Sequence, residues 1–388
     1  MPKWWNGRHA RLRGVWGDPW GFKSPLRHSI FREEGHTRRA PVPVNTPLAR
    51  VAVVGATGYT GGELLRLLAQ HPRIEVTAVT SEQSAGRPLS EKLPFLQKCY
   101  SLTLSSFDPA SVAEQADAVF MAVGHTQAMT SARLLLDAGK KVVDLSADFR
   151  LRSAALYEKW YGTPHLQPAL LKRAVYGLTE LHRKKIAHAD LVANPGCYPT
   201  GALLPIHPYL VHGVVDRQRA VIIDAKSGVS GAGRSPSATT HFPEIHEGFS
   251  AYNVGTHRHL PEIEQEMARI QKVKALFTPH LLPVNRGILT TIYLPLTRAL
   301  SQKKMEAILD TAYADAPFIR RVAGSPNLTS VRGSNFCDIA VFAAGRYAIL
   351  ISAIDNLVKG AAGQAIQNLN VMMGWEETLG LATPGLFP

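Results

Sequence analysis

Two residues of the sequence, Cys197 and His259, are of types that together could perform covalent catalysis. Cys197 lies in the segment 193–200, between a Pro-Gly pair and a second proline, and a small-residue run from Thr200 predicts a helix just after it. A thiol where a chain turns into a helix lies near unpaired amide donors and the positive end of the helix dipole, which favour the thiolate. We therefore predict a reactive cysteine with a lowered pKa, although a lone cysteine is more often a small core residue.

A pair of histidines, His257 and His259, flanks Arg258 just ahead of a predicted helix that begins with Pro261 and Glu262. Such a pair could bind zinc, but a third ligand is missing from the neighbourhood, so we predict no metal site. Histidine exchanges protons near neutral pH. Either of the two could therefore act as the base for the cysteine if the fold brings them together.

A dinucleotide-binding element is predicted near residue 50. The β-branched run 50–54 predicts a buried strand, which leads through the glycine-rich segment 55–62 into a helix over 63–70. In this order the glycines let backbone amides approach a pyrophosphate at the helix N-terminus. The predicted cofactor-binding residues of the turn are Gly55, Thr57, Gly58, Tyr59, Thr60 and Gly61.

The end of the second strand, predicted over 74–79, indicates which dinucleotide binds. An acidic residue there binds a ribose hydroxyl, whereas small polar or basic residues admit a 2′-phosphate. Ser81, Ser84 and Arg87 favour NADP(H) as the cofactor. Glu82 leaves the choice between NADP and NAD open.

The remaining pattern predicts an α/β fold with two sheets. Strands at 118–123 and 141–144, with a helix over 127–138 between them, continue the alternation of a doubly wound parallel sheet. A second, α+β domain is also predicted. Its strands are expected at 220–225, 288–295, 337–343 and 348–353, and a helix is expected at 307–314. A small-residue helix from 355 to 373 is expected to pack on the first domain.

Composition excludes several classes of protein. The chain has 388 residues, enough for two domains, and lacks the apolar run of about 18 residues that a membrane-spanning helix needs. Three scattered cysteines indicate a reducing compartment rather than a disulfide framework. Cys99 lies in a polar segment and Cys337 alternates with apolar neighbours, so neither is expected to react.

The net charge of +13 is concentrated near the N-terminus, because residues 1–50 hold ten Lys and Arg against three Asp and Glu. The mildly basic remainder suits an anionic substrate and cofactor, and no nucleic-acid or membrane partner is predicted. Residues 1–46 are expected to be a disordered, non-essential extension. A transit peptide and a nucleic-acid tail are the alternatives.

Six motifs occur in one order, at 55–61, 145–150, 194–200, 227–234, 257–262 and 355–360. With them the chain from Val51 to about Pro384 resembles the N-acetyl-γ-glutamyl-phosphate reductases, relatives of aspartate-semialdehyde dehydrogenase. The resemblance implies a Rossmann domain with an inserted catalytic domain of the glyceraldehyde-phosphate-dehydrogenase type. It also implies NADPH, a homo-oligomer (a tetramer or a dimer) and a cytoplasmic setting. Residues 1–46 match nothing in the family pattern, and family members often carry an arginine near the position of Glu82.

The resemblance also assigns roles and boundaries. It implies Cys197 as the nucleophile, His259 as the acid and base, and Asn356 beside the nicotinamide. The remaining predicted substrate-binding residues are Arg150, Asn194, Ser227, Ser230, Gly231, Arg234, His257, Arg258 and Glu262. We predict a dinucleotide-binding domain over 47–196, completed by a C-terminal segment 354–388, and a catalytic and oligomerisation domain over 197–353.

The implied reaction reduces N-acetyl-L-glutamyl 5-phosphate to N-acetyl-L-glutamate 5-semialdehyde and phosphate through a thioester on Cys197, in arginine biosynthesis. The aminoadipyl-phosphate homologue of lysine synthesis and aspartate-semialdehyde dehydrogenase are alternatives, because one methylene in a pocket changes binding by only about 1–3 kcal/mol. More remotely, Cys197 and His259 could serve a cysteine acyltransferase or hydrolase that has no hydride step.

Overall fold

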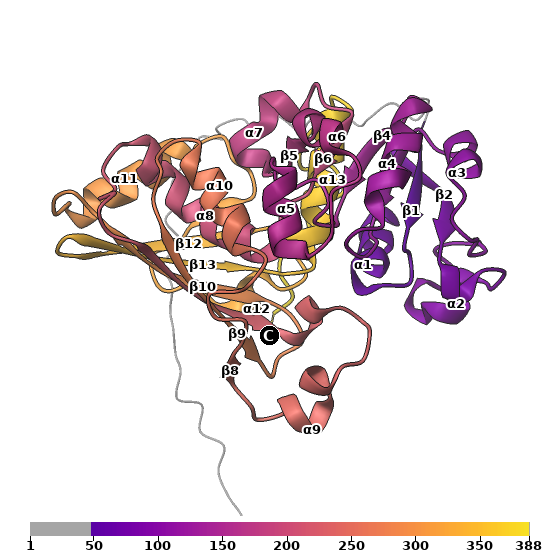
Figure 1. Ribbon diagram of the computed structural model, residues 1–388. Coiled ribbons are helices and arrows are strands. Elements are labelled where there is room, and N and C mark those ends of the chain that lie inside the picture. The colour runs from indigo at the N-terminus through magenta and orange to yellow at the C-terminus, as the bar shows by residue number, and fades with distance from the viewer. Residues whose placement is uncertain (1–47, 388) are drawn as a thin grey trace, which may run out of the picture. The chain divides into compact units, whose positions relative to one another are not determined.

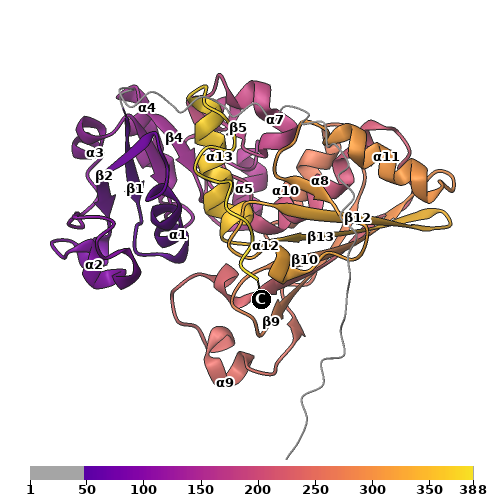
Figure 2. The ribbon, with the colours of Figure 1, turned by 180° about the vertical axis from the view of Figure 1, so that it is seen from behind.

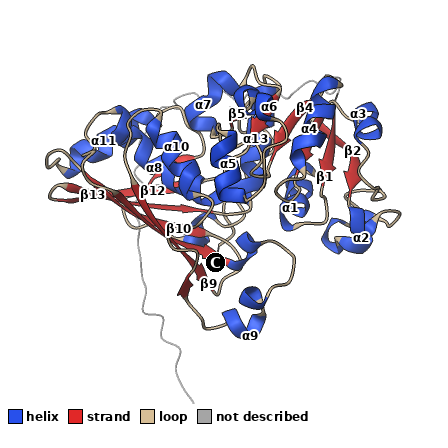
Figure 3. Ribbon diagram, viewed as in Figure 1, coloured by secondary structure: helices blue, strands red, loops and turns tan. Residues whose placement is uncertain are grey.

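The computed structural model describes residues 48–387, which form two β-sheets and the helices around them (Figures 1 and 3). The predicted N-terminal extension, 1–46, and its expected disorder lie outside the described residues. Within 48–387 no helix is long and apolar enough to cross a membrane.

The first sheet has six strands, all parallel, in the order β2-β1-β3-β4-β6-β5. Its strands are β1 (Ala49–Val54), β2 (Ile74–Thr80), β3 (Ala118–Met121), β4 (Lys141–Asp144), β5 (Val175–Tyr176) and β6 (Leu191–Ala193). The helices are α1 (Tyr59–Leu68), α2 (Leu89–Lys92), α3 (Pro109–Gln115), α4 (Ala128–Asp137), α5 (Ala154–Tyr161), α6 (Pro168–Arg173), α7 (Thr179–Ile186), α8 (Cys197–Val211), α9 (Phe242–Ile245), α10 (Leu260–Ala268), α11 (Gln302–Ala312), α12 (Leu328–Val331) and α13 (Gly363–Met372).

Alternation along β1 explains why helices cover both faces of this sheet. Val51 and Val53 pack in one core with α1 and α13, whereas Ala52 and Val54 pack in another with α3 and α4. Successive residues of a strand point to opposite faces, so an almost wholly apolar strand must be buried on both sides. The late helix α13 therefore belongs to the early sheet, as Figure 2 shows and as the sequence predicted.

The second sheet has seven strands in the order β11-β12-β13-β10-β7-β9-β8 and is mixed. Its strands are β7 (Val221–Gly228), β8 (Ser250–Ala251), β9 (Ala275–Leu282), β10 (Ile288–Pro295), β11 (Ile319–Arg321), β12 (Cys337–Ala344) and β13 (Tyr347–Ile354). Helices α8, α10 and α11 pack on one face of it and share its main core. The predicted α+β character of this half is confirmed, and Cys337 is a fully buried core residue as expected.

Several helix boundaries differ from the predictions. The helix expected at 307–314 is α11, Gln302–Ala312, and the one expected at 355–373 is α13, Gly363–Met372. The helix after the glycine turn begins at Tyr59 rather than 63, and α8 begins at Cys197 itself rather than at Thr200. Pro199 does not prevent this, because the first-turn amides of a helix have no partner within the helix and a proline there loses no hydrogen bond. A π-helix, Val358–Ala362, precedes α13 in place of regular helix.

A buried ion pair connects this π-helix to α7. Lys359 and Glu180 have fully buried side chains, and the Nζ atom of Lys359 lies 2.7 Å from Oε1 of Glu180 and 2.8 Å from Oε1 of Gln367. Burial acts to raise the pKa of Glu180, but the charge of Lys359 and these hydrogen bonds hold it below its ordinary value. Removing one partner would leave the other charge buried without compensation.

We expect Lys359→Met to lower the free energy of unfolding by about 3–5 kcal/mol at pH 8. The loss should be smaller at pH 5, because without Lys359 burial raises the pKa of Glu180 and a proton can neutralise the carboxylate. Urea unfolding at the two pH values measures both effects. Arg133→Ala, which breaks an exposed pair with Asp137 in α4, is the control and should cost less than about 1 kcal/mol. Equal losses for the two variants would contradict a structural role for the buried pair.

Candidate active site

Cys197 is the first residue of α8, immediately after the turn that leaves β6. Its neighbour Gly196 is the N-cap, and no side chain caps the helix, so the backbone amides of the first turn face the site. Burial nevertheless raises the pKa of the Cys197 thiol to about 11, although the charge of Arg150 and the backbone amide of Tyr198 act to lower it. The prediction of a lowered pKa is therefore wrong for the protein by itself, because desolvation outweighs the helix terminus.

Glu262, in the first turn of α10, holds the turn before the cysteine in place. Its Oε1 atom accepts hydrogen bonds from the Gly196 amide at 2.9 Å and from the Tyr176 hydroxyl at 2.7 Å. The side chain is 1% exposed, and burial raises its pKa. Glu262 was predicted to bind substrate, but its contacts make it a positioning residue for the nucleophile's turn.

His259, the N-cap of α10, packs directly against that turn. A Cβ atom added to Gly196 would lie 2.5 Å from the Nε2 atom of His259, so only glycine leaves room for the imidazole. Burial, followed by the charges of His257 and Arg150, holds the pKa of His259 well below its ordinary value. His259 is therefore a neutral imidazole at pH 7, the form that can accept a proton.

Arg150 lies on the other side of His259. Its guanidinium donates to the carbonyl oxygens of Asn194 and Leu145, each at 2.8 Å, and Nη1 lies 3.7 Å from the Oε2 atom of Glu262. Nη1 also lies 3.5 Å from the Nε2 atom of His259. That distance is at the limit of a hydrogen bond, and the Nδ1 atom of His259 is buried without a hydrogen-bond partner among the described residues. The positive charge of Arg150 disfavours the imidazolium form of His259.

The second histidine of the pair has a different position. The Nδ1 atom of His257 accepts the backbone amide of His259 at 3.1 Å, and its ring packs edge-on against Tyr198 and Phe277. Burial, then the charge of Arg258, lowers the pKa of His257 to about 4. The sequence left the choice of base open between the two. The contact with Gly196 favours His259 as the base. His257 packs next to His259 and accepts a hydrogen bond from its backbone amide.

A cavity of about 640 Å³ opens beside Cys197 within the second half of the chain. The predicted substrate-binding residues that line it are Ser227, Gly231, His257 and Arg258, and His259 lines it too. Ser227 is nearly fully buried, and its hydroxyl donates to the Gly228 carbonyl at 3.0 Å. Arg258 is exposed, with its guanidinium carbon 5.1 Å from the ring centre of Tyr161.

A second cavity, of about 340 Å³, joins Cys197 to the glycine turn. The predicted residues that line it come from both halves of the chain and are Gly58, Tyr59, Thr60, Arg150, Asn194, Ser230, Gly231, Arg234, His259 and Asn356. Asn356 accepts the Gly287 amide at 2.7 Å and donates to the Ser230 hydroxyl at 2.9 Å. Arg234 donates to the Thr57 carbonyl at 2.8 Å, a bond between the loop after β7 and the glycine turn.

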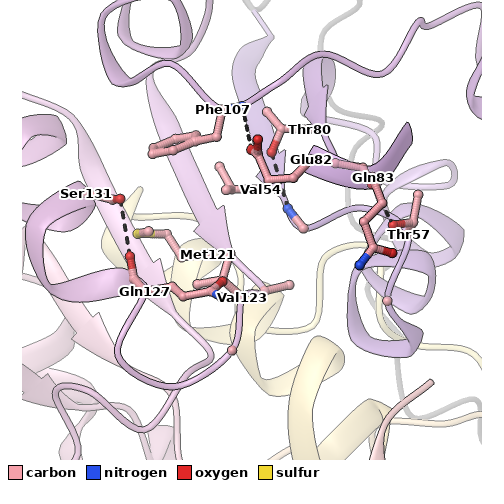
Figure 4. Close-up of a pocket in the computed structure, with 15 residues that line it drawn as sticks. Val54, Thr57, Thr80, Glu82, Gln83, Phe107, Met121, Val123, Gln127 and Ser131 are labelled. Carbon is pink, nitrogen blue, oxygen red and sulfur yellow. Dashed lines mark hydrogen bonds between the residues drawn. The ribbon is translucent and has the colours of Figure 1, made fainter. Parts of the chain in front are cut away.

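A third cavity, of about 340 Å³, continues from the glycine turn along the ends of β1, β2 and β3 (Figure 4). Gly55 has a φ of +84°, and a Cβ atom there would lie 2.3 Å from the Ala122 carbonyl oxygen. No side chain caps α1, so its first amides face this turn. An extended cavity with uncapped helix amides at its centre fits a dinucleotide.

The residues predicted to choose the dinucleotide are only partly in this cavity. Ser81 lines it, and its hydroxyl lies 2.9 Å from that of Thr57. Ser84 and Arg87 do not line it, and the Arg87 guanidinium pairs with Glu91 on the surface at 2.8 Å. Glu82, which left the choice of cofactor open, does line it.

Sequence reasoning missed several residues of the site. Tyr198 and Tyr252 join their hydroxyls at 2.9 Å on the wall of the larger cavity, and His125 reaches the site from the loop after β3. Gly360 of the π-helix lies against Cys197, because a Cβ atom there would lie 2.8 Å from the Cβ of Cys197. Tyr198 could have been predicted, because it follows Cys197 in the sequence. Tyr252, His125 and Gly360 reach the site only through long-range packing. Within 48–387 no cluster of His, Cys, Asp or Glu is placed to hold a metal ion.

Two family models match the chain. The semialdehyde dehydrogenase NAD binding domain matches residues 50–189, and the semialdehyde dehydrogenase dimerisation domain matches 197–356. The N-acetyl-gamma-glutamyl-phosphate reductase of Geobacter metallireducens is 50% identical over 348 residues, which are 88% of this chain and 100% of that protein. The chain belongs to the N-acetyl-γ-glutamyl-phosphate reductase family. Its relative of that name from Methanopyrus kandleri is 50% identical over 343 residues, which are 87% of this chain and 99% of that protein.

Solved structures of the same fold extend the relationship. Aspartate semialdehyde dehydrogenase II of Vibrio cholerae, complexed with ASA, matches 85% of this chain and 99% of its own with a TM-score of 0.65 at 17% identity. The Candida albicans aspartate semialdehyde dehydrogenase with NADP matches 84% and 98% with a TM-score of 0.62, also at 17% identity. The family membership and the α/β fold predicted from the motifs are both confirmed.

The pKa of Cys197 predicts how the thiol reacts in the protein alone. We expect its alkylation by iodoacetamide to accelerate about tenfold per pH unit from pH 7 to 10, because the thiolate fraction grows in that proportion below a pKa of about 11. Peptide mass spectrometry on Cys99→Ser protein, which lacks the exposed thiol, measures the rate at position 197. A rate that is already constant above pH 8 would show instead that the helix terminus stabilises the thiolate.

Proposed function

We propose that the protein reduces N-acetyl-L-glutamyl 5-phosphate to N-acetyl-L-glutamate 5-semialdehyde and inorganic phosphate, with NADPH as the reductant, in arginine biosynthesis. One observation carries the proposal. Cys197 and His259 border both the cavity of about 640 Å³ and the cavity that leads to the glycine turn. An acyl group on the sulfur would therefore lie between a substrate pocket and a dinucleotide site, and relatives with 50% identity bear the name of this reductase.

The first step forms a thioester. The sulfur of Cys197 attacks the acyl-phosphate carbonyl, the new C–S bond replaces the C–O bond to phosphate, and inorganic phosphate leaves with the bonding electrons. Phosphate is a good leaving group, so the main requirement is a thiolate held close to the carbonyl carbon. The uncapped amides at the start of α8 can stabilise the oxyanion of the tetrahedral intermediate, an effect of about 3–4 kcal/mol when such donors are well aimed.

His259 supplies the thiolate. The structure describes a neutral thiol beside a neutral imidazole, since burial raises the pKa of the one and lowers the pKa of the other. The thiol proton therefore has to move to the imidazole as the carbon–sulfur bond forms, and this is general base catalysis. After reduction, the same proton returns from the imidazolium to the alkoxide or the departing sulfur. Arg150 favours the neutral ring throughout, so the proton is not retained.

The chain's residues for the dinucleotide are the glycine turn, the hydroxyls of Thr57 and Ser81, and Asn356 near Cys197. When bound, NADPH supplies the hydride that reduces the thioester to the aldehyde level. The hydroxyls at the end of β2 and a solved neighbour named as an enzyme with NADP support NADPH as a coenzyme. Arg234, in the loop after β7, contacts the glycine turn through its hydrogen bond to the Thr57 carbonyl.

Recognition of the substrate's anionic groups is assigned by position. Arg258 and Arg234 border the cavities with exposed guanidinium groups, which suit a phosphate or a carboxylate. Arg150 is mostly engaged with backbone carbonyls and Glu262, so we assign it chiefly to orienting His259 and Asn194. Ser230 and Gly231, in a short 3-10 helix over Val229–Ala232, line the same wall, and the Ser230 amide is bonded to the Asn285 carbonyl at 3.1 Å.

The division of labour along the chain follows the two sheets. We propose that 47–196 with 354–388 binds the dinucleotide and that 197–353 carries substrate binding and self-association. Ile222, Leu276 and Tyr293 are 41%, 59% and 40% exposed on the face of the second sheet opposite α8, α10 and α11, which supports a homo-oligomer, a dimer or a tetramer. The match to a dimerisation domain supports it as well. A cytoplasmic setting is part of the proposal.

Two rivals use the same residues. A longer or shorter acyl phosphate would differ in how it fills the larger cavity, and assays with aminoadipyl and aspartyl phosphates distinguish them. A cysteine hydrolase or acyltransferase would need no dinucleotide. The cavity around the glycine turn, which joins the cysteine, favours the reductase.

We expect Cys197→Ser to abolish NADPH oxidation driven by the acyl phosphate, while NADPH still binds, because the hydroxyl is a far weaker nucleophile. In the unchanged protein, acid quenching during turnover should leave the acyl group on the peptide that contains Cys197, where mass spectrometry detects it. In the reverse direction, oxidation of the semialdehyde with NADP should require phosphate. Turnover by Cys197→Ser, or an acyl group at another residue, would refute the assignment of the nucleophile.

We expect His259→Asn to lower kcat by about 10²–10⁴-fold with little change in KM, because it removes the base but keeps a polar side chain beside Gly196. His188→Asn, an exposed histidine after α7, is the matched control and should retain full activity. If His259→Asn raises KM alone and leaves kcat unchanged, His257 is the base instead.

A further inference from the structure

The cavity in Figure 4 has an unusual charge for a site that would bind the adenosine half of NADPH. Among the described residues that line it, Glu82 is the only one with a charged side chain. Glu82 is the second residue after β2, near the strand end where an acidic residue binds the 2′-hydroxyl of an adenosine ribose in dinucleotide-binding folds. The question is whether its carboxylate is held where it would meet that group.

The carboxylate of Glu82 is fixed at the edge of the cavity. Its Oε1 atom accepts the backbone amide of Phe107 at 2.8 Å, a bond drawn in Figure 4. Among the described residues no donor bonds the other oxygen, which is left to accept a further hydrogen bond. Phe107 and Val123 line the same cavity and offer an apolar surface for a base. Ser81, one residue before Glu82, joins its hydroxyl to that of Thr57 in the glycine turn.

The nearest cations do not neutralise this end of the cavity. Arg87 lies on the surface and pairs with Glu91 at 2.8 Å, outside the cavity lining. Arg234 bonds the Thr57 carbonyl, but it lines the cavity toward Cys197 rather than this one. A 2′-phosphate carries close to two negative charges at pH 7 and would meet one carboxylate without a cation in the lining. A 2′-hydroxyl would instead find a charged acceptor.

We infer that Glu82 sets the coenzyme preference of this protein, by accepting a hydrogen bond from the ribose 2′-hydroxyl of NADH and repelling the 2′-phosphate of NADPH. The protein then binds NADH alongside NADPH, and the choice between them depends on one side chain. The inference rests on the dinucleotide site of the proposed function, but not on its acyl substrate.

The test measures binding of two fragments that lack the nicotinamide and cannot react, ADP-ribose and its 2′-phosphate, by calorimetry on the full chain. Glu82→Gln keeps the shape of the side chain and an oxygen for the Phe107 amide, so the local fold is retained. We expect the substitution to weaken the binding of ADP-ribose roughly tenfold, since a hydrogen bond to a charged acceptor is lost. The same substitution should strengthen the binding of the 2′-phosphate of ADP-ribose by roughly three- to tenfold, since a like charge is removed.

Glu75→Gln is the matched control, because Glu75 is exposed near the opposite end of β2 and the substitution removes the same charge. It should change neither affinity by more than about twofold. Thermal unfolding of both variants checks that the fold is unchanged. Parallel changes for both fragments in Glu82→Gln, or none, would overturn the inference while leaving the dinucleotide site intact. Failure of the unchanged protein to bind either fragment would overturn the dinucleotide site itself and the inference with it.

Discussion

The catalytic geometry depends on a single buried carboxylate. Glu262 connects the turn before Cys197 to the helix that begins after His259, through the Gly196 amide and the Tyr176 hydroxyl, with Arg150 nearby. Without it, α8 and α10 would still pack in the core of the second sheet, but the hydrogen bond that ties the Gly196 amide to α10 would be lost. Burying a carboxylate is costly, and here two donated hydrogen bonds and a neighbouring cation offset that cost.

That arrangement also determines the protonation states of the site. The same dry surroundings that strengthen the bonds of Glu262 penalise a free thiolate and an imidazolium, so Cys197 and His259 are both neutral before substrate arrives. Arg150 acts in opposite directions on the two groups, because its charge favours the thiolate and opposes the imidazolium. The thiol proton therefore moves to the imidazole as the new bond forms, and the site does not hold a thiolate–imidazolium pair beforehand.

The sequence predicted the fold class and the glycine turn because each has a local signature, and it indicated Cys197 as the nucleophile on the same ground. The apolar runs at β1, β4 and β10 matched their strands closely, since buried strands must be apolar. The start of α8 was placed three residues late, because the restriction on residues before proline was given more weight than the tolerance of a first helical turn.

What sequence could not supply was long-range proximity and desolvation. Glu262 was assigned to the substrate because its motif adjoins the histidines, whereas its partner amide lies 66 residues earlier in the chain. The thiol pKa was predicted in the wrong direction because a helix terminus is visible in sequence and the surrounding burial is not. Gly360 belongs to the motif 355–360, but that motif did not reveal its contact, which is with a residue far away in the chain.

The contact between Gly360 and the nucleophile has a consequence for how the protein is made. The wall behind the sulfur consists of residues that leave the ribosome more than 150 positions after the cysteine itself. While the ribosome is still adding the second sheet, the thiol has its helix but not its neighbour, and α13 has not yet covered the first sheet. The cysteine and the histidine are therefore synthesised well before the residues that complete the wall of their site. The site can be complete only after the last part of the described chain has been made.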